Sequence, residues 1–168
     1  ASTTRKLDLL IDAMDLVDDR FTLHFMLVGS QTALNTLKKQ AEKCGKKVVF
    51  DDPVDVRLIP QAINVYDAEV IFFPPLTQNL RFVLPNKLFE AIQARLAIVT
   101  GQSSEIVNVL NRYGNGVVVD GWTAEDLARG ISSLTPESVA KLKRASDRAA
   151  AELSSQSEKL IFAAALGL

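Results

Sequence analysis

Short apolar runs alternate with helical apolar stripes along nearly the whole chain, and this alternation limits the fold more than any other feature. The apolar runs predict strands at 23–28, 47–50, 69–73, 96–100 and 116–119. Apolar residues at helical spacing predict helices at 7–17, 33–44, 59–66, 87–95 and 104–112, and two more after Thr123 and Thr135. Continuously apolar strands separated by helices are typical of a parallel sheet that is covered on both faces. The sequence therefore predicts an α/β fold with a mostly parallel sheet.

Residues that start and stop helices support these boundaries. Ser2, Thr3 and Thr4 are candidate caps for the first helix, and Thr123 and Thr135 precede the last two. Gly45 and Gly114 follow the second helix and the helix at 104–112, and Pro60 is compatible only with a first turn.

Composition excludes several classes of protein. With 168 residues we expect one domain, and 19 basic against 20 acidic residues give no indication of nucleic-acid binding. The single cysteine, Cys44, excludes an internal disulfide and a multi-cysteine metal site. No apolar run approaches the ~20 residues of a membrane span and no secretory pattern opens the chain, so the expected compartment is the cytoplasm.

The stretch Leu84-Pro85-Asn86-Lys87-Leu88-Phe89-Glu90 suggests a ligand site. It follows a buried strand that Pro74 and Pro75 end, and Asn86 is a good N-cap, so a helix should begin near residue 87. Free amides and the positive end of the helix dipole favour a diphosphate there, and Lys87 adds a positive charge. Glu90 lies one turn inside and is placed to accept hydrogen bonds from sugar hydroxyls. The alternative is that Glu90 only complements the dipole and Lys87 is a solvated surface charge.

Parallel sheets bind ligands at the carboxyl ends of their strands, near the switch point in strand order. The loops that line this edge are Gly29-Ser30, residues 51–54 with Pro53 and Val54, the segment 74–85, and Gly101 to Ser103. Gly29 would let the backbone approach a ligand, although a lone glycine after a strand also serves as a turn residue. Neither the dinucleotide glycine fingerprint nor a P-loop occurs, which counts against a dinucleotide oxidoreductase and a P-loop enzyme.

Several segments, taken in order, resemble the C-terminal domain of the retaining family 4 glycosyltransferases, which have the GT-B architecture. The main one is Phe72-Phe73-Pro74-Pro75, then Asn79, then residues 84–99. Weaker similarity covers residues 7–13, Leu27-Val28-Gly29, Tyr66-Asp67-Ala68 and 113–119. The resemblance implies a Rossmann-like domain that binds the nucleoside diphosphate sugar donor as a substrate, without a cofactor or a bound metal.

By this resemblance, Glu90 holds the ribose, the loop from Val83 to Asn86 faces the diphosphate, and Asp52 to Val54 hold the base. Two positions depart from the family pattern: Phe82 stands where a second glutamate often contacts the donor sugar, and Lys6 replaces a glycine. Arg5 falls at the place of the basic residue that neutralises the diphosphate. No catalytic residue is assigned.

The resemblance also implies a domain fragment. Acceptor binding belongs to an N-terminal domain that residues 1–168 do not contain, so the expected enzyme is the full-length glycosyltransferase and the isolated chain should be inactive. The family begins this domain with a central strand before the helix at 7–17, so the sheet here should close in another way, or a neighbouring chain should fill the gap. Peripheral membrane association of the full-length enzyme stays open. The alternative function is a non-catalytic flavodoxin-like interaction or regulatory module with a degenerate site.

Overall fold

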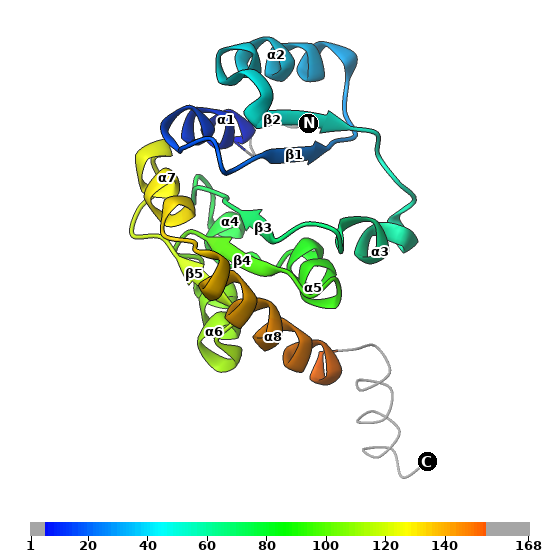
Figure 1. Cartoon of the computed structure of the whole chain (residues 1–168), viewed down its shortest axis with the longest axis vertical. Helices are drawn as coiled ribbons and strands as arrows, with labels where there is room; N and C mark the ends of the chain where they lie inside the picture. Colours follow the sequence, from blue (N-terminus) through cyan, green and yellow to red (C-terminus); the bar gives the residue numbers. More distant parts are fainter. Residues whose placement is uncertain (1–5, 154–168) are drawn as a thin grey trace.

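The computed structural model describes residues 6–153 (Figure 1). Its strands are β1 (Leu23–Met26), β2 (Val48–Asp51), β3 (Ala68–Ile71), β4 (Ala97–Thr100) and β5 (Gly116–Val118). Its α-helices are α1 (Leu7–Leu16), α2 (Gln31–Ala41), α3 (Ile59–Ile63), α4 (Gln78–Arg81), α5 (Asn86–Gln93), α6 (Ser104–Tyr113), α7 (Ala124–Ser132) and α8 (Pro136–Glu152). Two 3₁₀ helices, η2 (Glu42–Lys47) and η3 (Val56–Leu58), precede β2 and α3.

All strand pairs are parallel, so the predicted α/β class is confirmed, but the strands form two sheets. One sheet has the order β1-β2, with Leu23 opposite Val48, and the other has the order β3-β4-β5, with Ala68 opposite Ala97. In the described residues β1 and β3 do not pair with each other. The expected single sheet is therefore divided into two in the described residues.

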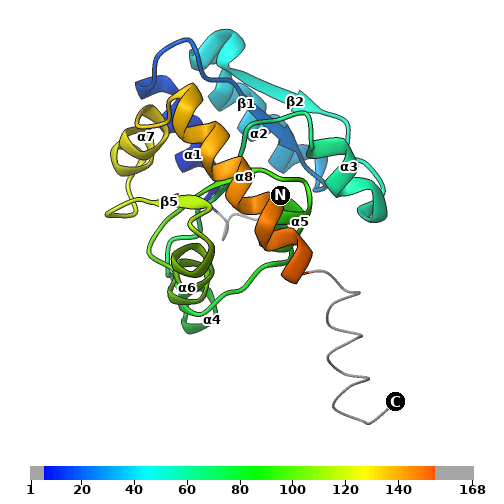
Figure 2. The same ribbon diagram turned by 60° about the horizontal axis from the view of Figure 1, so that its bottom comes forward.

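The helices cover both faces of the strands. On one face α1 contacts α2 and α7, and on the other α5 contacts α3 and α8, which also contacts α6 (Figure 2). Each face has its own buried core. Leu10 and Ile11 of α1 pack with Leu127 of α7 in the first core, whereas Leu88 and Ile92 of α5 belong to the second.

Most predicted helix boundaries are confirmed, and two caps are wrong. Thr123 and Thr135 each form a capping box, and Gly114 ends α6 with a φ of 67°. The N-cap of α5 is Pro85 rather than Asn86, which is already the first helical residue and makes no capping hydrogen bond. The N-cap of α1 is Lys6, with a φ of 49°, while Ser2 to Thr4 lie outside the described residues.

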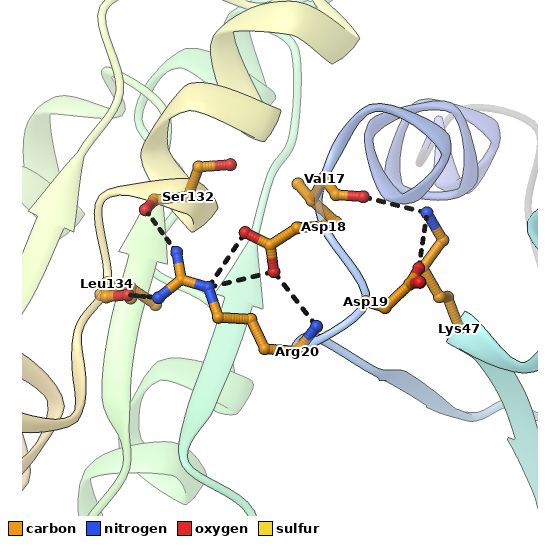
Figure 3. Close-up of polar contacts among 7 residues, drawn as sticks. All are labelled: Val17, Asp18, Asp19, Arg20, Lys47, Ser132 and Leu134. Carbon is orange, nitrogen blue, oxygen red and sulfur yellow. Dashed lines mark hydrogen bonds and ion pairs between the residues drawn. The ribbon is translucent and has the colours of Figure 1, made fainter.

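The Arg20 side chain links two halves of the molecule, one that contains β1 and β2 and one that contains β3, β4 and β5 (Figure 3). Its guanidinium donates to the carbonyl oxygen of Ser132 at 3.1 Å and to that of Leu134 at 3.3 Å, at the C-terminal end of α7. Asp18 orients it through Nε at 3.0 Å, and the same contact lowers the pKa of the Asp18 carboxyl. A cation at the last carbonyls of a helix satisfies acceptors that the helix leaves unpaired. Arg20 therefore caps α7 from the chain segment that leads into β1.

We expect Arg20→Met to lower the free energy of unfolding by about 1 kcal/mol, because two charge-assisted hydrogen bonds are lost at a partly exposed site. Arg57→Met is the matched control: Arg57 also pairs with an aspartate two residues earlier, Asp55, but in the described residues it bonds to no distant element. The control should change stability by less than about 0.5 kcal/mol. Urea denaturation of both variants measures the difference, and equal effects would show that Arg20 does not join the halves.

Candidate functional site

A cavity of about 870 Å³ lies between the two sheets, and its lining reaches the carboxyl ends of the strands. At that end it is lined by Val28 after β1, by Pro53 and Val54 after β2, and by Lys87 and Glu90 of α5. Because the strands are parallel, these loops meet at one edge. The structure thus brings together four of the predicted site residues, Pro53, Val54, Lys87 and Glu90.

Lys87 is not a solvated surface charge. Its ammonium group is paired with a carboxylate rather than left unpaired beside the first amides of α5. Its Nζ donates to Oε1 of Glu69 on β3 at 2.9 Å and lies 5.7 Å from the centre of the Phe73 ring. Both side chains of the ion pair are mostly buried, with 34% of Lys87 and 24% of Glu69 exposed. Glu69 was not among the residues predicted from the sequence. A charged residue inside an otherwise apolar parallel strand was the signal that would have found it.

Glu90 is half-buried beside this ion pair. Burial first, and then the negative charge of Glu69, raise the pKa of the Glu90 carboxyl, whereas Lys87 lowers it. Glu137, in the first turn of α8, shows the opposite behaviour: hydrogen bonds from its own backbone amide and from Thr135 lower its pKa. Glu90 is the fifth residue of α5 and lies behind the first turn, so its position is not that of a first-turn acid that complements a helix dipole.

The first turn of α5 offers backbone donors. The amide of Leu88 donates to the carbonyl of Pro85 at 3.0 Å, but in the described residues no acceptor binds the amides of Asn86 and Lys87. The Asn86 side chain is exposed at the same edge. Unbonded amides at a helix start are suited to an anionic group.

A hydrogen bond from the start of α6 holds the loop before α5. Ser103, which is buried at the start of α6, donates its hydroxyl to the carbonyl of Val83 at 3.4 Å. Leu84 is exposed, and so is Phe82, at 65%. Phe82 ends α4, a short helix that the sequence analysis did not predict. Val83 to Asn86 lie beside the cavity rather than in its wall.

The loops after β1 and β4 complete the edge. Gly29 is exposed, and the hydroxyl of the following Ser30 accepts from the amide of Ala33 at 3.3 Å to cap α2. A side chain at Gly101 would clash, because a Cβ there would come within 2.2 Å of the Trp122 ring. Arg5, the predicted partner of a diphosphate, lies outside the described residues.

The described part of the chain contains no group of three or more histidine, cysteine, aspartate or glutamate side chains able to hold a metal ion. Across residues 6–153, no helix combines the length and the apolar character that crossing a bilayer requires.

The raised pKa of the Glu90 carboxyl predicts how the stability of the protein changes with pH. A carboxyl with a higher pKa in the folded than in the unfolded protein binds more protons when folded, so its contribution to stability falls as pH rises from its ordinary value of 4.5. Wild type should therefore lose stability relative to Glu90→Gln between pH 4.5 and neutral pH. Glu137→Gln is the control of opposite sign, since the lowered pKa of Glu137 gives stability that is lost as pH falls below 4.5. Urea denaturation from about pH 3.5 to 7 tests both, and parallel curves for wild type and Glu90→Gln would contradict the burial effect.

Solved structures show the same fold. HepE (Alr3699) of Anabaena in complex with UDP-glucose is 18% identical, with a TM-score of 0.73 over 90% of this chain and 42% of that chain. WaaG, a glycosyltransferase involved in lipopolysaccharide biosynthesis, is 14% identical, with a TM-score of 0.64 over 90% of this chain and 40% of that one. The chain thus spans less than half the length of these proteins, and at such identity the likeness shows the fold alone.

The sequence itself carries the family assignment. Comparison with curated proteins finds no match. The family model for group 1 glycosyltransferases, however, matches residues 2–136, which is most of the chain and includes α1, both sheets and α7. The chain therefore belongs to the group 1 glycosyltransferases and has the fold of a GT-B C-terminal domain.

Proposed function

We propose that this chain is the donor-binding domain of a retaining glycosyltransferase and binds a nucleoside diphosphate sugar at the carboxyl edge of its strands. The observation that carries the proposal is the position of Glu90. It is a half-buried carboxyl in the wall of the cavity, one turn behind two backbone amides that have no acceptor in the described residues. An acceptor of sugar hydroxyls and donors for a diphosphate are thus about one helical turn apart.

The chemistry of the edge fits each part of such a donor. Glu90 accepts hydrogen bonds from the ribose hydroxyls, and the first amides of α5 donate to the diphosphate. The base lies against Pro53 and Val54, both exposed at the cavity end. The ion pair of Lys87 with Glu69 fixes the wall behind Glu90. Uridine is the first base to test, because the Anabaena protein of the same fold is described in complex with UDP and with UDP-glucose.

In the transfer reaction the bond between the anomeric carbon and the diphosphate oxygen breaks. The oxygen of the acceptor hydroxyl bonds to that carbon and loses its proton, which the departing diphosphate can accept. The diphosphate leaves with the bonding electron pair, so donors at the start of α5 stabilise the charge that develops. The acceptor is held by an N-terminal domain of the full-length enzyme. This domain contributes donor binding and stabilisation of the leaving group, and no residue of it is assigned to bond making.

We expect Glu90→Gln to weaken UDP binding about tenfold to a hundredfold, because a neutral amide replaces a charged acceptor at nearly the same size. Glu137→Gln makes the same change at a glutamate that is not among the residues lining the cavity, and it should leave the affinity unchanged. Calorimetric titration of the three proteins with UDP, GDP and ADP measures the effect.

Two results would contradict the ribose role or the function as a whole. Equal affinity of wild type and Glu90→Gln would remove Glu90 from the donor site. Absence of binding by the full-length protein with all three diphosphates would instead favour the non-catalytic module. Saturating ligand should also stabilise the chain, by about 2.7 kcal/mol at 100 times the dissociation constant, which thermal melting detects independently.

A separate prediction concerns activity. The isolated chain should transfer no sugar from UDP-glucose even where it binds UDP, because transfer requires donor and acceptor to be held together at reacting distance. Measurement of UDP release with the chain alone and with the full-length protein tests this. Turnover by the purified chain at the full-length rate would contradict it.

A further inference from the structure

Tyr66, which lines the cavity, connects the two halves of the molecule. Its hydroxyl donates to Oδ2 of Asp51, the last residue of β2, at 3.1 Å. Nδ1 of His24 on β1 lies 2.8 Å from the same oxygen, and the rings of His24 and Tyr66 are 4.8 Å apart. Tyr66 itself belongs to the segment between α3 and β3. A side chain of the second half therefore binds a carboxylate of the first half.

The register of the first sheet explains why His24 and Asp51 meet. His24 is opposite Val49, and Asp51 is two residues further along β2. Because side chains two residues apart on a strand point to the same face, His24 and Asp51 lie on one face of the sheet. Only 30% of the His24 side chain and 31% of the Asp51 side chain are exposed, so most of their contact surface with Tyr66 is shielded from water.

Backbone contacts fix Tyr66 on the second half. Its amide donates to the carbonyl of Ile63 at the end of α3 at 3.0 Å, and its carbonyl accepts from Nζ of Lys143 on α8 at 2.6 Å. Nζ of Lys143 also lies 3.7 Å from the carboxylate of Asp67. Burial first, and then the hydrogen bond to Asp51 and its charge, raise the pKa of the Tyr66 hydroxyl, which therefore stays protonated and able to donate at neutral pH.

The first-half side of this contact leads directly to the loop proposed to hold the base. Asp51 is followed two and three residues later by Pro53 and Val54, which both line the cavity. A hydrogen bond that fixes the Asp51 side chain therefore restrains the start of this loop.

The second-half side of the contact leads to the residues proposed to hold the ribose. Tyr66 is three residues before Glu69, and Glu69 pairs with Lys87 at 2.9 Å. Lys87 is three residues before Glu90 on α5. A short series of contacts through Tyr66 thus joins the two groups that a nucleotide would bridge.

We propose that Tyr66 is a positioning residue for the donor, whose hydroxyl holds the loop after β2 at the separation from Glu90 that one nucleotide can bridge. This inference rests on the proposed function. Without the hydroxyl the two parts would adopt a range of separations, and only a fraction of the molecules would have the one that lets a nucleotide contact both. The apparent dissociation constant rises in inverse proportion to that fraction.

The test is calorimetric titration of the chain of residues 1–168 with UDP, GDP and ADP, followed by comparison of variants with the diphosphate that binds most tightly. Tyr66→Phe keeps the ring beside His24 and removes only the hydroxyl. We expect it to raise the dissociation constant about tenfold at unchanged stoichiometry, as a competent fraction of about one tenth would do. A purely structural defect would instead lower the number of binding sites and the melting temperature at an unchanged dissociation constant.

Tyr113→Phe is the matched control. Tyr113 is the other tyrosine of the chain, and its hydroxyl also donates to a carboxylate, that of Glu152, at 3.0 Å. These two residues lie on α6 and α8, which contact each other, and neither lines the cavity. Tyr113→Phe should therefore bind the diphosphate as tightly as wild type.

A second variant tests whether Tyr66 acts through Asp51. Asp51→Ala removes the acceptor and should weaken binding at least as much as Tyr66→Phe. Adding Tyr66→Phe to Asp51→Ala should weaken binding no further, because both changes break the same contact.

Three results would overturn the inference and leave the proposed function intact. They are an equal dissociation constant for wild type and Tyr66→Phe, an equal loss of affinity in Tyr113→Phe, and losses that multiply in the double variant. Failure of wild type to bind any of the three diphosphates would overturn the proposed function, and the inference with it.

Discussion

The packing of α1 against α7 holds the molecule together, because no strand pairing joins its two sheets in the described residues. Their shared core contains Leu10, Ile11 and Met14 from α1 and Leu127 and Ile131 from α7. Helix α1 carries β1 and β2 with it, while α7 follows directly from the sheet of β3, β4 and β5. The relative position of the two sheets, and therefore the shape of the cavity between them, depends on this helix pair and on the Arg20 contacts at its end. It also depends on Tyr66, whose hydroxyl donates to Oδ2 of Asp51 at 3.1 Å and whose ring lies 4.8 Å from that of His24.

The candidate site takes residues from both halves, so its geometry depends on how α1 packs against α7. Pro53 and Val54 belong to the half with β1 and β2, whereas Lys87 and Glu90 belong to the half with β3. The polar residues of the second half contact one another, because Glu69 of β3 fixes Lys87, and burial together with the charge of Glu69 raises the pKa of the Glu90 carboxyl. A ligand that contacts residues of both halves would bridge the two parts of the molecule that α1 and α7 hold together. Its affinity would then depend on how firmly α1 and α7 are packed.

The sequence predicted the elements well and the site in part, for a physical reason. Apolar periodicity records burial, so strands and helices were placed within a few residues, and the position of Glu90 behind a helix start followed from the stretch at 84–90. Apolar periodicity does not show which side chains pair in the folded protein. The partner of Lys87 is eighteen residues earlier in a strand, and the capping of α5 by Pro85 instead of Asn86 depends on loop geometry that spacing does not record. The division of the sheet was anticipated only through the resemblance.

The first core has a consequence for how the chain folds during synthesis. Its α1 side chains pack against Leu127, Ile131 and Leu134, more than a hundred residues further along the chain. The second core also needs the end of the chain, because Ala149 and Ala150 of α8 pack with Leu88 and Ile92 of α5. The apolar side chains of α1 that face α7 stay uncovered until α7 has been made. The two cores therefore become complete only late in synthesis, the first with α7 and the second with α8.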